Sequence, residues 1–281
     1  MDNEELEITL LLDAMRYRYG YDFRGYARAS LTRRIRKGLE ESPFEKISEM
    51  IPAIIYDRAF FSIFVRNLSV HVTEMFRDPE FFYALRKKVV PYLKTFPFIK
   101  IWSAGIATGE EVYSLAILLK EEGLYDKSRI YATDFSDTVL ESAKKGIYST
   151  ELIKKNTKNY QESGGRKSFG NYYHADYNSA IFDRSLKENI VFANHNIVTD
   201  SVFGEMNLIL CRNVLIYFDA DLQNRVLQLF FDSLRPNGFL CLGNKETLEF
   251  SGVKEYFVHF VKKQKVFQKK RKQWLEDAKS I

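Results

Sequence analysis

The sequence predicts an α/β protein in which an all-helical N-terminal domain precedes a mostly parallel sheet with helices on both faces. In the first 70 residues, apolar side chains recur at helical spacing in one segment after another. After Pro91, short apolar runs that end in glycine or aspartate alternate with helical patterns, which is typical of a parallel sheet. We expect domains at 1–75 and 76–281, with a small antiparallel β-subdomain inserted at about 150–187.

The clearest N-terminal helix is predicted over residues 27–40, where Leu31, Ile35 and Leu39 recur every fourth residue. Helices are also indicated around residues 6–15 and 60–70. The basic residues of the helix predicted over 27–40 lie off its apolar stripe: Arg28, Arg33, Arg34, Arg36 and Lys37. Such a face is either solvated or a docking surface for an acidic partner.

The second domain is predicted to alternate strands with helices. The expected strands span 99–105, 129–134, 189–193, 206–210 and 238–243, followed by a terminal hairpin of 256–261 and 265–268. The expected helices span 109–122, 137–145 and 220–234. Residues 150–187 break this alternation with glycines, tyrosines and polar residues, so we expect a three-stranded antiparallel flap there.

The composition favours a globular protein of the cytoplasm. Of the 281 residues, 46% are apolar, and the net charge of +5 does not demand a nucleic acid partner. The two cysteines and four histidines have no metal-ligand spacing, so no metal is expected. The acidic start lacks the basic region of a signal peptide, and no apolar run is long enough to span a membrane.

The loop from Ser103 to Glu111 follows the first strand of the predicted sheet. Ligands bind beyond the carboxyl ends of parallel strands, and Gly105 would let a ligand approach the backbone. The loop lacks the Gly-x-Gly-x-x-Gly pattern of nicotinamide enzymes, and its two glutamates would repel a pyrophosphate. A cofactor with a cationic amino acid end suits it better. The alternative is a structural turn before a charged helix start.

Three further segments supply candidate side chains. Asp134 ends the second strand, where it could bind ribose hydroxyls or cap the next helix. Arg212 and Asn213 follow a buried strand, and a buried arginine should meet a carboxylate of Glu111, cofactor or substrate. Arg77 and Tyr217 could reach the same cleft. Their alternatives are a helix-cap segment and a core aromatic.

At these residues the chain resembles the CheR chemotaxis methyltransferases. The segments "VTEMFRD", "IWSAGIATGEEVYSLAILL", "ATDFSDTVLESAKKGIY" and "LILCRNVLIYFD" occur in that family's order and at about its spacing. The resemblance covers nearly the whole chain. It implies a class I methyltransferase fold and methyl transfer from S-adenosylmethionine to glutamate carboxylates of chemoreceptors, with S-adenosylhomocysteine as the product. Since glutamate is ionised at neutral pH, that reaction needs no general base.

The resemblance also implies roles for particular residues. The cofactor pocket maps onto His71, Thr73, Arg77, Glu111, Asp134, Asn196, Ile197, Arg212 and Asn213. Arg77 and Tyr217 fall beside the transferring methyl, and the basic helix falls on the cytoplasmic helical region of the receptor. The chain departs from the family at His71, where asparagine is common, at Ile106-Ala107, and at "GNKETL". A monomer without nucleic acid is expected.

Two other functions remain open from the sequence. The first is a methyltransferase of another protein or of RNA, because fold alone does not set the substrate. The second is a non-catalytic cofactor-binding module of a signalling complex. A nicotinamide oxidoreductase is disfavoured by the missing glycine pattern.

Overall fold

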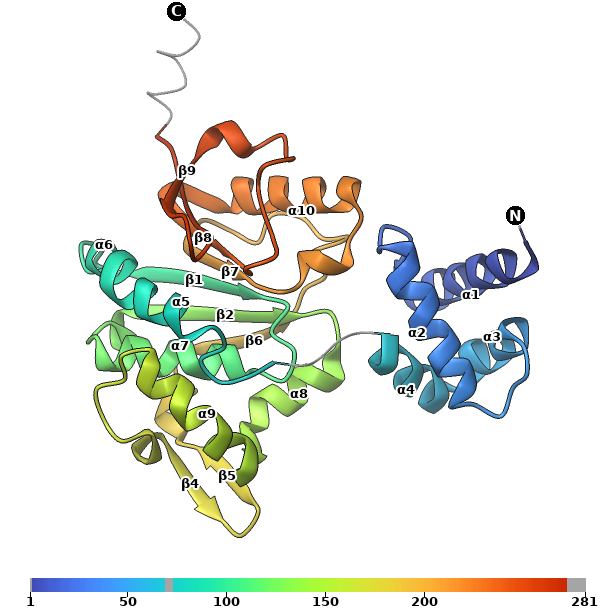
Figure 1. Cartoon of the computed structure of the whole chain (residues 1–281), viewed down its shortest axis with the longest axis horizontal. Coiled ribbons are helices and arrows are strands. Elements are labelled where there is room, and N and C mark those ends of the chain that lie inside the picture. The colour runs from blue at the N-terminus through green and yellow to red at the C-terminus, as the bar shows by residue number, and fades with distance from the viewer. Residues whose placement is uncertain (1, 69–72, 272–281) are drawn as a thin grey trace, which may run out of the picture. The chain divides into compact units, whose positions relative to one another are not determined.

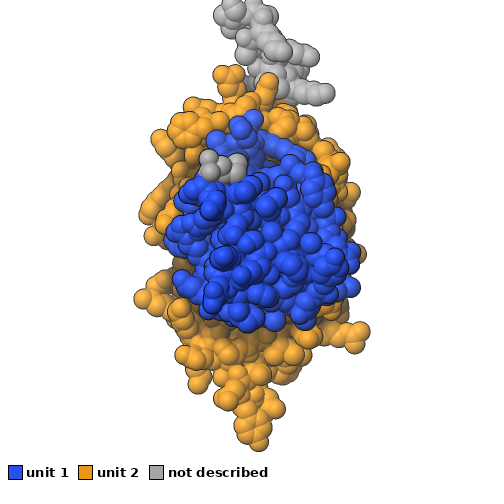
Figure 2. Space-filling view, turned by 90° about the vertical axis from the view of Figure 1, so that its right-hand side faces the viewer, with its two compact units in different colours: residues 1–71, 217–225 blue, residues 72–216, 226–281 orange. Residues whose placement is uncertain are grey.

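The computed structural model describes residues 2–68 and 73–271, and the chain divides into two compact units, coloured separately in Figure 2. Unit 1 comprises residues 1–71 and 217–225, and unit 2 comprises residues 72–216 and 226–281. The domain boundary expected after residue 75 stays a prediction. No pattern in the sequence indicated that residues 217–225 group with the N-terminal helices.

Unit 1 is built from helices, as predicted. They are α1 (Asn3–Tyr19), α2 (Arg28–Glu40), α3 (Ile47–Tyr56) and α4 (Arg58–Leu68). In α2 the predicted stripe faces inward, with Leu31 and Ile35 buried. A Cβ on Gly38 would lie 2.7 Å from the ring of Phe64, so the small residue permits the close packing of α2 on α4. The hydrophobic stripe therefore decides which face of α2 stays exposed.

Residues 217–225 pack within unit 1 against the start of α2. The N–H of Ala27 donates to the carbonyl of Tyr217 at 2.8 Å, and the N–H of Asp219 donates to the carbonyl of Gly25 at 2.8 Å. Tyr26 and Phe218 form an antiparallel bridge between these bonds. The backbone around residue 218 is thus fixed by strand-like hydrogen bonds.

Unit 2 contains the predicted mostly parallel sheet, in the order β6-β2-β1-β7-β8-β10-β9. The strands are β1 (Ile99–Ala104), β2 (Ser128–Asp134), β6 (Ile190–Asn194), β7 (Met206–Cys211), β8 (Leu234–Leu242), β9 (Phe257–Val261) and β10 (Val266–Lys269). Pairing from β6 to β8 is parallel, whereas β10 runs antiparallel to both β8 and β9. The sheet and its terminal hairpin are confirmed.

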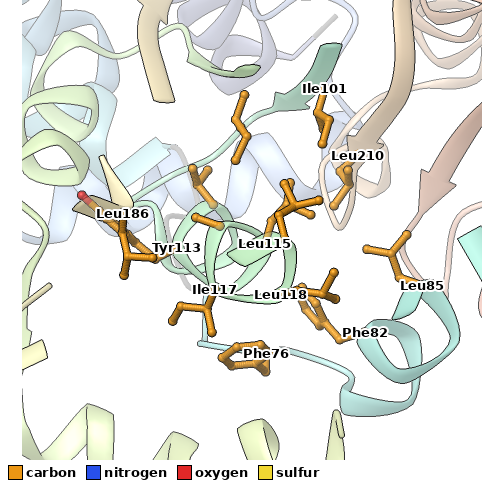
Figure 3. Packing of buried hydrophobic residues seen from close by; sticks show 14 of the residues in the cluster. Phe76, Phe82, Leu85, Ile101, Tyr113, Leu115, Ile117, Leu118, Leu186 and Leu210 are labelled. Carbon is orange, nitrogen blue, oxygen red and sulfur yellow. The ribbon is translucent and has the colours of Figure 1, made fainter. Parts of the chain in front are cut away.

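Helices lie on both sides of this sheet (Figure 1). Successive side chains of the central strand point to opposite faces, so each face packs against its own layer of helices. The longer helices are α7 (Glu110–Glu121), α8 (Asp137–Lys145), α9 (Thr150–Glu162) and α10 (Ala220–Ser233). Ile101 of β1 joins the apolar cluster that surrounds α7 (Figure 3). Trp102, the next residue, packs edge-on against Phe230 of α10, with ring centroids 5.3 Å apart.

Shorter segments connect these elements. Residues 79–93 form the continuous run α5 (Pro79–Ala84), η1 (Leu85–Val89) and α6 (Val90–Leu93), in which η1 is a π-helix. The remaining single turns are η2 (Tyr125–Lys127), η3 (Phe169–Tyr172), η4 (Arg184–Leu186), η5 (Leu215–Tyr217) and η6 (Lys254–Tyr256). No helix of the described residues is long and apolar enough to cross a membrane.

The predicted antiparallel subdomain is confirmed as a three-stranded sheet of order β3-β5-β4. Its strands are β3 (Ile147–Ser149), β4 (Tyr173–Asp176) and β5 (Ser179–Phe182), so it begins before residue 150. The helix α9 between β3 and β4 was not predicted. It starts where the Ser149 hydroxyl accepts the N–H of Leu152, a helix-capping bond, and it buries Ile153 and Tyr160 on one face.

Strand β1 lies between β2 and β7, which is where the strand order reverses. From β1 the chain proceeds outward through β2 and β6, then returns to β7 on the other side of β1. The loops that follow β1 and β7 both begin at this switch point, where open parallel sheets bind ligands.

Candidate functional site

The loop after β1 is shaped by glycines and held by the end of β2. The N–H groups of Gly105 and Ile106 both donate to the carbonyl of Thr133, at 2.8 and 3.1 Å. Gly105 has a φ of +71°, and a Cβ there would lie 2.7 Å from a methyl group of Val214. Glycine is required because the backbone is left-handed and the loop after β7 lies against it.

Asp134 joins three loops at the end of β2. Its carboxylate accepts the N–H of Ala107 at 3.0 Å and the N–H of Ser136 at 3.1 Å. Its carbonyl accepts the N–H of His195, in the loop after β6, at 3.2 Å. Burial raises the pKa of the Asp134 carboxyl to about 6, although backbone hydrogen bonds oppose the rise. This carboxylate is therefore buried, ionised at neutral pH, and central to the loops.

The two glutamates that begin α7 have different surroundings. Glu110 is buried and accepts the Thr108 hydroxyl at 2.6 Å, and burial raises its pKa to about 7. Glu111 instead accepts a hydrogen bond from Nη1 of Arg212 at 2.6 Å. Only the second glutamate therefore joins the loop after β1 to the loop after β7.

Arg212 is the centre of the charged cluster at this edge of the sheet. Its side chain is 1% exposed, and its Nη2 donates to the carboxylate of Asp78 at 2.5 Å. Nη1 also lies 3.3 Å from the carbonyl of Arg77, and the guanidinium stands 4.0 Å from the ring centroid of Phe81. The expectation that Arg212 meets a carboxylate is confirmed for Glu111. Asp78 is a second carboxylate that the sequence analysis missed.

The segment that carries Arg77 has an unusual backbone. Phe76 and Asp78, on either side of Arg77, have left-handed φ angles of 51° and 57°. The N–H of Phe76 donates to the hydroxyl of Ser114 in α7 at 2.8 Å. Non-glycine residues in this conformation persist where surrounding contacts hold them, and such strain gathers at functional sites. Arg77 itself is half-buried.

Glu246 holds the loop that follows Arg212. Its buried carboxylate accepts the N–H groups of Asn213 at 3.1 Å and of Val214 and Leu215 at 2.8 Å each. It also accepts the N–H of Gly243, at the end of β8. Asn213 is left-handed, with a φ of 61°, and its buried Oδ1 has no hydrogen-bond partner among the described residues. The clamp thus leaves an unsatisfied acceptor at the sheet edge.

Two more predicted residues lie in the loop after β6. The side chain of Asn196 accepts the N–H of Val198 at 3.0 Å, and its own N–H donates to Asp200 at 2.8 Å. Ile197 is buried. The bond from His195 to Asp134 places this loop beside the end of β2. Thr73 is half-buried at the start of the described segment of unit 2, and His71 lies outside the described residues.

The structure therefore brings together many, but not all, of the predicted residues. Gly105, Glu111, Asp134, Arg212 and the Arg77 backbone join through the contacts above. Tyr217 belongs to unit 1, where the guanidinium of Arg34 lies 4.9 Å from its ring centroid. The basic residues of α2 are also in unit 1.

Those basic residues differ in how they are engaged. Arg36 forms a two-point ion pair with Glu4, at 2.5 and 2.8 Å, and Lys37 lies 3.6 Å from Glu41. Arg28 donates to the carbonyl of Glu5 and the hydroxyl of Thr9, both at 3.2 Å. Arg33 is exposed and makes no hydrogen bond or ion pair with the described residues.

Sequence reasoning missed Asp78 and Glu246, because each has a simpler explanation in the sequence. Asp78 precedes Pro79 at a helix start, which is the pattern of an N-cap, yet its side chain makes no capping bond. Glu246 follows a strand in a short polar loop and looks solvated in sequence. The available signals differed: Glu246 lies shortly after the carboxyl end of a strand, and Asp78 is adjacent to the expected active-site residue Arg77.

Comparison with known proteins gives a consistent result. The family model of the CheR methyltransferase SAM binding domain matches residues 71–266, and that of the CheR methyltransferase all-alpha domain matches residues 6–69. A Pseudomonas putida protein that carries the methyltransferase name Cher3 is 48% identical over 267 residues, covering 95% of this chain and 98% of that protein.

More distant relatives are similar over less of their length. A chemotaxis protein methyltransferase of Listeria innocua is 29% identical and matches over 82% of this chain and 85% of its own. Chemotaxis protein methyltransferase 2 of Pseudomonas aeruginosa is 32% identical over 66% of each chain. A solved N-methyltransferase, NodS of Bradyrhizobium japonicum, has 15% identity and a TM-score of 0.34 over 60% of this chain and 62% of its own. That likeness is too weak to support a statement about this protein.

The sheet, the helical unit and the matched family models define a class I methyltransferase that depends on S-adenosylmethionine. Within that class, the chain belongs to the CheR methyltransferase family. Its cofactor is S-adenosylmethionine. The family and its chemotaxis relatives support methylation of chemoreceptors as the function, and they do not favour the alternative substrates or a non-catalytic role.

Proposed function

We propose that the chain transfers a methyl group from S-adenosylmethionine to glutamate side chains in the cytoplasmic helical region of chemoreceptors, which gives methyl esters. The observation that carries the proposal is buried Arg212, held between Glu111 and Asp78 where the loops after β1 and β7 meet. This cluster suits a zwitterionic amino acid end better than a phosphate, because two carboxylates outnumber the single cation.

The residues present fit the cofactor in two further respects. The buried Oδ1 of Asn213 has no partner among the described residues, so it can accept a hydrogen bond from a bound group. Asp134 stands at the strand end where acidic residues bind ribose hydroxyls in such folds. The proposed cofactor contacts are therefore His71, Thr73, Arg77, Gly105, Glu111, Asp134, Asn196, Ile197, Arg212 and Asn213.

The residues of the site act by charge and alignment. Glu111, Asp78 and Arg212 sum to one negative charge, which attracts a cofactor whose sulfonium gives it a net positive charge. The cofactor supplies a methyl group that is already activated, so an ionised glutamate needs no general base. We propose that Arg77 and Tyr217 lie beside the reacting atoms and align the incoming carboxylate.

Docking of the receptor is proposed for the exposed face of α2. Arg33 is the clearest contact, since it is exposed and makes no ion pair with the described residues. A basic face would attract an acidic helical bundle and raise the rate of encounter. We propose that the enzyme acts as a monomer in the cytoplasm, where that part of the receptor is accessible.

Two measurements test the function. Calorimetry should give micromolar binding of S-adenosylmethionine, about −7 to −8 kcal/mol, that is largely lost in Asp134→Ala. A tritiated methyl group should pass to a receptor cytoplasmic fragment as a base-labile ester, and not to RNA. Glu141→Gln is the matched control, because Glu141 lies exposed on α8 and forms an ion pair with Lys144 one turn along the same helix.

The outcomes separate the two parts of the proposal. Binding without any base-labile ester would leave the cofactor site intact and refute the substrate. A wild-type protein that binds neither S-adenosylmethionine nor its demethylated product would refute the assignment of the cofactor contacts.

A further inference from the structure

Arg34 differs from the other basic residues of α2 in facing the interior of unit 1. Its side chain is half-buried, and its Nη1 donates to the carbonyl of Leu68, the last residue of α4, at 2.5 Å. The neighbouring Arg33 and Arg36 are exposed. A guanidinium that is already bound and half-covered is poorly placed to dock on a partner, so its position requires another explanation.

The guanidinium of Arg34 covers the ring of Tyr217. Its central carbon lies 4.9 Å from the ring centroid, within the range of a cation–π contact. The hydrogen bond to Leu68 fixes the guanidinium on one side, so the contact is made by a group that is held in place. A planar guanidinium stacks on an aromatic ring in a way that a lysine ammonium does not.

The backbone on both sides of Tyr217 is held independently of Arg34. Within unit 2, Glu246 accepts the N–H groups of Val214 and Leu215. Within unit 1, Ala27 donates to the Tyr217 carbonyl and Tyr26 bridges to Phe218. With the backbone held, the ring of Tyr217 can still move by rotation about its side-chain torsion angles. The contact with Arg34 restricts this rotation.

We propose that Arg34 is a positioning residue that fixes the ring of Tyr217 for methyl transfer, and is not a receptor contact. This rests on the proposed function, in which Tyr217 acts beside the reacting carboxylate. The helix α2 then carries two separate tasks. The exposed Arg33 binds the receptor, and the half-buried Arg34 orients a reactive-site tyrosine.

Steady-state kinetics on a receptor cytoplasmic fragment distinguish the two tasks. Arg34→Ala should lower kcat by about tenfold or more, since misalignment affects the chemical step, while KM for the fragment and the Kd of S-adenosylmethionine stay within about twofold. Arg33→Ala is the matched control and should raise KM with kcat nearly unchanged. Arg34→Lys, which keeps the charge and can still donate to Leu68, should recover little of kcat.

The opposite pattern would overturn the proposal. If Arg34→Ala raised KM as Arg33→Ala does, or if Arg34→Lys restored full activity, Arg34 would be a docking charge. Thermal unfolding of each variant shows whether the unit remains folded. If Arg34→Ala does not fold, the kinetics of Arg34→Lys provide the test.

A second readout does not depend on activity. In protein labelled with 13C-tyrosine, the ring signal of Tyr217, assigned by its loss in Tyr217→Phe, should shift in Arg34→Ala and Arg34→Lys but not in Arg33→Ala. An unmoved signal in both Arg34 variants would refute the positioning role by itself. A wild-type enzyme that forms no ester on the fragment would instead refute the substrate, while the ring signal would still decide whether Arg34 holds Tyr217.

Discussion

Asp78 and Arg212 are 134 positions apart in the sequence, and their side chains meet at 2.5 Å. Asp78 occupies the N-cap position of α5, but its backbone is left-handed and its carboxylate does not cap the helix. The carboxylate turns instead to the guanidinium of Arg212, which also contacts the carbonyl of Arg77. The strained segment that presents Arg77 is therefore joined to the carboxyl edge of the sheet by an ion pair.

Asp78→Asn should weaken both the fold and cofactor binding. The substitution removes one of two carboxylates from a guanidinium that is 1% exposed, although Asp78 itself is 34% exposed. We expect the free energy of unfolding to fall by about 1–2 kcal/mol, and binding of S-adenosylmethionine to weaken as the local negative charge is lost. Urea unfolding and calorimetry measure the two effects. Glu80→Gln, at an exposed pair in the same segment, should change neither, and an equal response of both variants would argue against a specific role for Asp78.

Glu246→Gln should disorder the loop after β7. A neutral amide offers one oxygen where the carboxylate accepts four backbone N–H groups, and its NH2 group would face two of those donors. We expect a loss of about 2–3 kcal/mol in the free energy of unfolding, with weaker cofactor binding through Arg212 and Asn213. Glu249→Gln is the control in the same loop, because Glu249 is an exposed partner of Lys254. Retention of full stability by Glu246→Gln would show that the clamp is dispensable.

Binding of S-adenosylmethionine should weaken as the pH falls through about 6. Burial raises the pKa of Asp134 to about 6 in the free protein, and its ionised form is the one that accepts hydrogen bonds from ribose hydroxyls. Affinity should be constant above pH 7 and fall by up to about tenfold per unit well below pH 6. Calorimetry between pH 5 and 8 measures the transition.

Protonation of Asp134 should not itself unfold the protein over this range. Its folded pKa lies above the ordinary value of 3.8, so between these values the folded state holds a proton that the unfolded state has lost. Lowering the pH therefore favours folding through this group. Glu110, with a pKa of about 7, is another buried carboxyl near the loop, and Glu110→Gln should leave the transition in place. A transition that disappears in Glu110→Gln would assign it to Glu110.

Arg33→Glu should reduce receptor methylation without affecting the cofactor. Arg33 is exposed and makes no ion pair with the described residues, so reversing its charge breaks no internal contact there. We expect a higher KM for the receptor fragment, a steeper penalty at low salt than at high salt, and an unchanged Kd for S-adenosylmethionine. Arg36→Glu is a poorer test, since it would place a second carboxylate beside Glu4. Equal loss of methylation and cofactor affinity in Arg33→Glu would contradict docking through α2.

Sequence patterns predicted the secondary structure where an element has either a continuous apolar run or one uniformly apolar face. The strands β1, β2 and β7 lie close to their predicted ranges, because buried parallel strands are continuous apolar runs. The helix α9 was missed, since its buried positions include the polar Asn156 and its surroundings are rich in glycine and tyrosine. A buried stripe that includes a polar residue is hard to recognise as a core-facing helix in a single sequence.

The sequence by itself determined the sheet, the helical N-terminal unit, and the loop positions where Gly105, Glu111, Asp134 and Arg212 occur, because these depend on local patterns and chain order. Only the tertiary structure decided which carboxylates meet Arg212, that Glu246 clamps the neighbouring loop, and that Arg34 turns inward onto Tyr217. Partners for a buried charge are chosen by distance in space, and residues far apart in the chain become neighbours only after the core has packed.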